Sequence, residues 1–285
     1  MDPEDSGRRP VRGGEEGGGP RSRRRPPGGR RLRRGDSGGY GPRRKRLLTG
    51  VRPVPTVPAG PASDVLVYTR TTGYRHDSIP AGATALTELA KAAGLEARVT
   101  EDPADFTPER LGRCAAVVFL STTGTVLTAA GRSAFEAYVR RGGGFLAVHA
   151  AANAEPDWPF YGRLLGTRFD GHPEIQPGVV RVADGDHPAT AVLPDRWAWT
   201  DEWYNFTANP RGSGVRVLAT ADESSYRGGT LGADHPLVWC REEGRGRVLF
   251  TALGHAAEAY EDPAFRAHLA GALVWVTERG PARRP

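Results

Sequence analysis

The spacing of apolar residues divides the chain near residue 63 and predicts alternating strands and helices beyond that point. Segments with the pattern of strands lie at 65–68, 95–100, 115–120 and 145–148. Between them, apolar positions recur at helical spacing after Pro80 and after Thr128, and glycines end both stretches. Strands that alternate with helices in this way predict a parallel sheet with helices on both faces.

The second half of the chain has shorter and more frequent strand patterns. They lie at 179–182, 197–199, 215–219, 237–239 and 248–252. A final helix is expected to begin near Asp262-Pro263 and to bury a stripe from Phe265 to Val276. The predicted fold class is α/β, with one doubly wound, mostly parallel sheet and β-rich excursions.

Composition sets the first 62 residues apart from the rest. Gly, Pro and Arg make up 39 of them, so we expect a disordered tail at 1–62, a folded domain at 63–279 and a short tail at 280–285. The tail holds 16 basic and 6 acidic residues, whereas the other 223 residues hold 23 and 27. A basic footprint confined to the tail argues against a nucleic-acid-binding fold and leaves weak RNA binding through Arg and Gly. A start assigned too far upstream, a passive tail and an export signal stay open.

The two cysteines, Cys114 and Cys240, lie next to or inside apolar runs and are expected in the core. No CxxC pair suggests a zinc knuckle, and no segment has the roughly 18 apolar residues of a membrane span. We therefore expect a soluble, cytoplasmic protein that does not associate with membranes.

Unusual polar residues follow the predicted strands. In open parallel sheets, ligands bind at the carboxyl ends of the strands, so these loops are the first place to look for chemistry. The residues found there are Arg75 and His76, Ser121–Gly124, His149, and Gly254 with His255. Their clustering predicts a site at that edge of the sheet.

The segment from Gly144 to Ala151 has the layout of a nucleophile elbow, a buried strand followed by a polar residue and small neighbours. The elbow residue is His149, which can carry protons or bind metal but seldom acts as an acyl nucleophile. The preceding glycines, 142–144, run from helix to strand and therefore do not form a phosphate loop. The alternative for His149 is a structural histidine that bonds a loop carbonyl.

Other histidines and carboxylates are candidates for the same site. His172 and His235 precede prolines, which fix the direction of their side chains; His187 resembles a plain turn residue and His268 a helix-core residue. Residues 201–206 combine two carboxylates, an amide and three aromatic residues, which suits a carbohydrate or, alternatively, a packed edge strand. Divalent zinc or manganese is a candidate ligand of the loop histidines, which are His76, His149, His172, His235 and His255.

These segments together resemble the trehalose-utilisation, or ThuA-like, family. The matching parts are Thr72–His76, Gly142–Ala151, Trp158–Gly166 with His172-Pro173, Asp201–Phe206 and Gly246–Phe265. The resemblance implies a flavodoxin-like sheet of the class I glutamine amidotransferase type. Amidotransferases carry cysteine at the elbow, so His149 argues against glutamine hydrolysis.

The resemblance also implies a sugar substrate, a disaccharide or a 3-keto-glycoside made by a partner dehydrogenase. A ketone acidifies the neighbouring C–H, so one base could remove that proton before elimination or isomerisation; lyase, hydrolase and isomerase all stay open. His149, His255 and Glu202 are the candidate catalytic residues. The candidate substrate-binding residues are Arg75, His76, His172, Tyr204, Asn205 and His235. The rival interpretation is a non-catalytic sugar-binding or interaction module, and a homo-oligomer is compatible with either.

Overall fold

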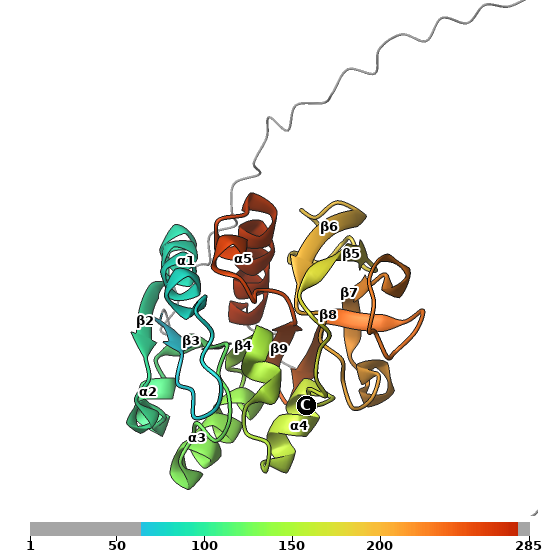
Figure 1. Cartoon of the computed structure of the whole chain (residues 1–285). Coiled ribbons are helices and arrows are strands. Elements are labelled where there is room, and N and C mark those ends of the chain that lie inside the picture. Colours follow the sequence, from blue (N-terminus) through green and yellow to red (C-terminus); the bar gives the residue numbers. More distant parts are fainter. Residues whose placement is uncertain (1–63, 279–285) are drawn as a thin grey trace, which may run out of the picture. The chain divides into compact units, whose positions relative to one another are not determined.

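The computed structural model describes residues 64–278 and places nine strands in one sheet, in the order β2-β1-β3-β4-β9-β8-β7-β5-β6 (Figure 1). The predicted tails at 1–62 and 280–285 lie outside the described residues, so the expected domain boundaries stay predictions.

One half of the sheet is parallel. It consists of β1 (Asp64–Tyr68), β2 (Glu96–Thr100), β3 (Cys114–Leu120), β4 (Gly144–Val148) and β9 (Gly246–Thr251). With β9 counted as fifth, the strand order is 2-1-3-4-5, as in flavodoxin-like sheets. Every residue of β4 is buried, as its continuous apolar run predicts.

The other half is antiparallel. It consists of β5 (Gln176–Val182), β6 (Arg196–Asp201), β7 (Arg216–Ala221) and β8 (His235–Glu243). Four of the eight strand pairings are antiparallel, so the prediction of a mostly parallel sheet is wrong. The reason is the connections: two residues join β8 to β9 and no α-helix joins β5 to β6, whereas a parallel pair needs a long crossover.

Helices cover both faces of the sheet, as predicted. Figure 1 shows α1 (Ile79–Ala92) and α5 (Pro263–Thr277) on one face, and α2 (Pro108–Leu111), α3 (Ala129–Arg140) and α4 (Pro159–Leu165) on the other. Thr128 caps α3 and Asp262 caps α5, each through a side-chain oxygen that accepts backbone N–H bonds. Within residues 64–278, no helix combines the length and hydropathy of a membrane span.

The antiparallel half curls back toward the parallel half. Three strands separate β6 from β9, and in a flat sheet that separation would be roughly 19 Å at about 4.8 Å per strand. Nevertheless, an oxygen of Asp201, at the end of β6, accepts a hydrogen bond of 2.9 Å from the backbone N–H of Gly254, beyond β9. The accumulated twist of the strands therefore brings the end of β6 to the carboxyl edge of the parallel half.

Candidate functional site: a histidine–carboxylate centre

Three histidines from the parallel half converge on one carboxylate from the antiparallel half. His76 lies in the loop after β1, His149 directly follows β4, and His255 lies beyond β9. Glu202 directly follows β6. One potential ligand atom from each of these four residues lies within 4.8 Å of the other three, and we call this set the histidine–carboxylate centre. The prediction that strand-end loops would meet is confirmed for these histidines.

The centre is built around one carboxylate oxygen, Oε2 of Glu202. It lies 3.1 Å from Nδ1 of His255, 3.3 Å from Nε2 of His149 and 3.8 Å from Nε2 of His76. The three imidazole rings pack edge to face, with interplanar angles of 67° to 88°. Glu202 is 9% exposed, so most of its hydration is replaced by these rings.

His149 has the backbone geometry of an elbow. Its φ is +52°, a left-handed conformation that turns the chain sharply where β4 ends. Its Nδ1 donates a 2.7 Å hydrogen bond to the carbonyl of Ala252, which directs Nε2 toward the centre. Nε2 lies 3.0 Å from the hydroxyl of Tyr204, so it accepts from tyrosine when neutral and donates to Glu202 when protonated.

The loop that carries His76 is fixed by the strand beside it. The hydroxyl of Thr123 donates a 2.7 Å bond to the carbonyl of Tyr74, and the N–H of Thr72 donates to the carbonyl of Thr123. These bonds hold His76 against the centre, where it is 5% exposed. Its Nδ1 is buried and has no hydrogen-bond partner among the described residues.

Asp201 fixes the position of the His255 loop. Its Oδ1 accepts from the N–H groups of Glu202 and His255, and its Oδ2 accepts from Gly254 N–H and the indole of Trp199. Gly254 has φ +115°, a conformation that favours glycine, and this lets two successive N–H groups reach the same carboxylate. Asp201 is therefore a positioning residue for the centre.

The histidines and Glu202 shift one another's acidity. Burial alone would raise the pKa of Glu202, but hydrogen bonds from His149, His255 and His76 outweigh it and hold the carboxyl pKa well below its usual range. The hydrogen bond to Glu202 raises the pKa of His255, against the effect of burial. Burial lowers the pKa of His76, in spite of the same carboxylate. The centre thus holds a buried negative charge and one imidazole that favours its cationic form.

Two further side chains connect the centre with solvent. Nε2 of His172 lies 3.4 Å from Oε1 of Glu202, and 35% of its side chain is exposed. Its Nδ1 contacts the carbonyl of Pro173 at 2.9 Å, so Nε2 is the nitrogen left for chemistry. Tyr74, which is 66% exposed, packs edge-on against His76 with ring centroids 4.8 Å apart. The sequence analysis did not single out Tyr74.

Three predicted site residues lie outside the centre. Arg75 pairs with Glu101 at 2.6 Å and is half exposed. The amide of Asn205 bonds the carbonyl of Gly228 and the N–H of Thr230, so it is used within the fold. His235 contacts Glu223 at 2.6 Å and the carbonyl of Tyr204 at 2.7 Å, which fixes the tyrosine backbone from behind.

The aromatic residues of 201–206 do not form a sugar platform. Trp203, Tyr204 and Phe206 are 0%, 2% and 3% exposed, so the stacking interpretation is wrong for these rings. Trp203 packs on Tyr226 instead, with ring centroids 4.7 Å apart. The alternation of faces is confirmed, because Glu202 and Tyr204 both point toward His149 although the strand ends at Asp201.

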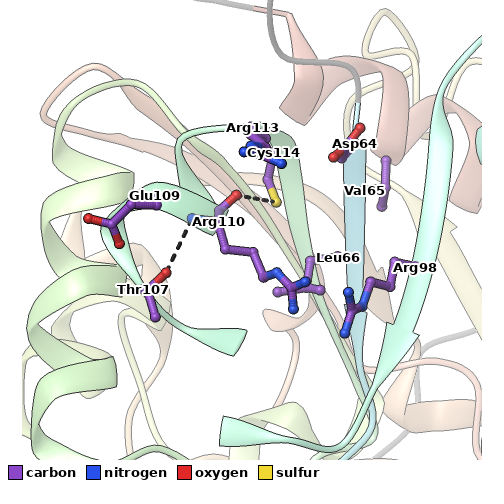
Figure 2. A pocket seen from close by; sticks show the side chains of 9 residues that line it. All are labelled: Asp64, Val65, Leu66, Arg98, Thr107, Glu109, Arg110, Arg113 and Cys114. Atoms are coloured by element: carbon purple, nitrogen blue, oxygen red, sulfur yellow. Dashed lines mark hydrogen bonds between the residues drawn. The ribbon is translucent and has the colours of Figure 1, made fainter. Parts of the chain in front are cut away.

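The two thiols and a nearby cavity lie away from the centre. Cys114 begins β3 and Cys240 lies in β8; burial raises their pKa values to about 11 and about 12, as expected of core cysteines. Figure 2 shows a cavity of about 440 Å³ beside Cys114. Arg98 and Arg110, in its lining, both pair with Asp105. The cavity lies at the amino ends of β1 and β3 and therefore belongs to the edge opposite the histidines.

Fold and site together define a mixed α/β protein whose elbow carries histidine, where related hydrolytic sites carry a nucleophile, and whose buried carboxylate is surrounded by imidazoles. The sequence profile of the ThuA family, described as "Trehalose utilisation", matches residues 64–276, and the chain belongs to this family. No curated protein is significantly similar in sequence.

Solved structures agree with this assignment. A ThuA-like protein from Bacteroides uniformis is 28% identical, with a TM-score of 0.64, over 77% of this chain and 94% of that one. A ThuA-like protein from Parabacteroides merdae is 21% identical, with a TM-score of 0.62, over 79% and 95%. A cytoplasmic protein from Salmonella typhimurium, 13% identical with a TM-score of 0.51 over 75% and 98%, shares the fold.

Proposed function

We propose that this protein acts on a ketone-bearing sugar unit of a disaccharide, such as a 3-keto-glycoside, by removing the proton next to the ketone. The family supports the disaccharide class, since its description is trehalose utilisation. The observation that carries the proposal is the centre itself, a buried carboxylate whose imidazole neighbours include two that reach solvent. Enolisation needs one base and one electrophile in contact with substrate, and this pair supplies them.

The two exposed imidazoles take opposite roles. His172 is the base, because its Nε2 is accessible and its Nδ1 is held by a carbonyl. His255 is the electrophile that receives the enolate oxygen, because Glu202 favours its cationic form. Glu202 lies between the two rings and orients both.

Burial assigns His149 and His76 to positioning. The side chain of His149 is fully enclosed, so a substrate atom has no access to it without rearrangement. His76 is nearly as enclosed. Both rings hold Glu202 from the interior side, and Tyr204 fixes His149. Tyr74 at the rim offers an exposed ring face for a sugar.

The bond changes follow from the position of the ketone. His172 removes the proton from the carbon between the ketone and the anomeric carbon, and the C–H electron pair becomes the enolate. As the enolate collapses, a carbon–carbon double bond forms and the bond from the anomeric carbon to the glycosidic oxygen breaks. That oxygen takes the proton back from His172, so the products are an unsaturated keto sugar and a free sugar. A dehydrogenase must supply the ketone. A cytoplasmic location and a homo-oligomer belong to the same proposal.

The test is incubation of the full chain with 3-keto-trehalose and with trehalose, followed by NMR. We expect turnover of the keto sugar alone, with exchange of the proton next to the ketone in deuterated water. His172→Gln should abolish both signals, whereas His187→Gln, a buried histidine that packs on Trp275 outside the centre, should retain them. Ligand-dependent stabilisation without turnover or exchange would favour a sugar-binding module, and retained activity in His172→Gln would overturn the assigned base.

A further inference from the structure

Electrostatics in the centre calls for a cation. When neutral, each nitrogen that faces Glu202 presents a lone pair to a negatively charged oxygen. Protonating one ring relieves one contact, but three imidazolium ions with centroids 4.8 to 5.4 Å apart would repel one another. A single ion that accepts all four lone pairs removes both problems.

The net charge of the surroundings leads to the same requirement. Asp201 and Glu202 are adjacent, buried carboxylates. Among residues 64–278, neither of them pairs with a lysine or arginine, and the ion-pair partners of Glu202 are histidines. Buried carboxylates without a fixed cation are costly, and a divalent ion would balance these two.

The distances fit a four-coordinate metal. Zinc binds imidazole nitrogen and carboxylate oxygen at about 2.0–2.1 Å, so neighbouring ligand atoms of a tetrahedron lie roughly 3.3 Å apart. The three nitrogens lie 3.1, 3.3 and 3.8 Å from Oε2 of Glu202. The atoms are therefore placed for coordination with shifts of a few tenths of an ångström, and His76, whose distance is longest, has to move most.

Supporting groups already hold the ligands as a metal site requires. Metal-bound histidine usually donates its other N–H to a carbonyl, and Nδ1 of His149 does so to Ala252. His255 is held through its backbone by Asp201. The hydroxyl of Tyr204 also hydrogen bonds Glu202, so it can leave Nε2 of His149 free for the ion.

We propose that His76, His149, His255 and Glu202 bind one divalent transition-metal ion of the zinc type. Imidazole-rich sets suit zinc, whereas Mg²⁺ and Ca²⁺ prefer oxygen ligands. The bound ion would take the place of the His255 proton as the electrophile for the enolate oxygen. Metal binding itself does not depend on the sugar reaction and is measured without sugar.

The experiment uses the full chain without an affinity tag, because a histidine tag would bind the same metals. After chelator treatment and desalting, Zn²⁺ is titrated by calorimetry and Co²⁺ by visible absorption, which is intense for four-coordinate cobalt. We expect one ion per chain and competition between the two metals. Glu202→Gln and His255→Ala should each weaken Zn²⁺ binding more than about 100-fold, and Asp201→Asn about 10- to 100-fold.

His187→Gln is the matched control and should bind Zn²⁺ as the wild type does. Circular dichroism of each metal-free variant shows whether it is folded, and His255→Ala, at a partly exposed position, is the variant expected to fold best. Folded wild type that binds no stoichiometric Zn²⁺ or Co²⁺ overturns the proposal. So does binding that is unchanged in both Glu202→Gln and His255→Ala. Metal binding without sugar turnover would support this proposal and count against the proposed function.

Discussion

Asp201→Asn tests whether one carboxylate joins the two halves of the sheet. The substitution keeps the shape of the side chain and leaves no cavity, but it replaces one acceptor oxygen by an amide donor. Each carboxylate oxygen accepts two hydrogen bonds at 2.8 to 3.2 Å, so two N–H donors lose their acceptor whichever way the amide is oriented. A buried unsatisfied donor costs about 1–3 kcal/mol, which predicts a loss of about 2–6 kcal/mol.

Thermal and urea unfolding of Asp201→Asn against wild type would measure this loss. For a domain of this size 1 kcal/mol corresponds to about 2–4 °C, so the middle of the range, about 3 kcal/mol, lowers Tm by about 6–12 °C. Asp195→Asn makes the same chemical change at an exposed position and should stay within about 0.5 kcal/mol of wild type. If Asp201→Asn unfolds within 1 kcal/mol of wild type, the carboxylate does not hold the His255 loop and our account of the junction is refuted.

Three further predictions concern stability and reactivity. Burial lowers the pKa of His268 to about 4, so the unfolded chain binds a proton that the folded chain excludes; stability should fall by roughly 3 kcal/mol from pH 7 to pH 4, and urea unfolding of His268→Gln should show a correspondingly shallower pH dependence. Gly254→Ala places a Cβ 2.9 Å from a tyrosine hydroxyl oxygen at positive φ, so its Tm should fall more than that of Gly171→Ala, which has similar φ and no contact within 4 Å. The raised pKa values of Cys114 and Cys240 predict slow reaction with a disulfide reagent at pH 8 and fast reaction in denaturant; fast native reaction would mean an accessible thiol.

The parallel half could be predicted from sequence because its signals are local. Continuous apolar runs give strands buried on both faces, and Thr128 and Asp262 stand where helix caps are expected. The elbow could be predicted for the same reason, since strand, polar residue and small neighbours are consecutive. Its residue, His149, has the expected positive φ.

The direction of the later strands could not be predicted from the periodicity of their residues. Burial patterns indicate that a segment is a strand, but direction depends on the connection, and the sequence analysis extended the parallel pattern to the second half. The separation between β8 and β9 is two residues, Gly244 and Arg245, which permits a hairpin and excludes a crossover. Connection length was therefore the signal that the prediction did not use.

The same distinction separates the site residues. His76, His149 and His255 follow strands whose carboxyl ends must meet, so their convergence is a matter of topology. Asn205 and His235 are surrounded by polar neighbours in sequence too, but their partners are backbone groups of nearby loops, which no sequence pattern specifies. Without those contacts, a structural amide or histidine cannot be told from a functional one.

Glu202 shows why the centre needs both halves of the sheet. It follows β6, an edge strand that three others separate from β9, and only the curl of the antiparallel half brings it to the histidines. The side-chain period of a strand is two, so a slip of one residue at β6 would turn Glu202 away and present Asp201 to the imidazoles. The bonds from Asp201 to Gly254 and His255 fix that register. The pair Asp201-Glu202 thus divides two tasks between adjacent carboxylates: one fixes the strand in place, and the other carries the charge that the site uses.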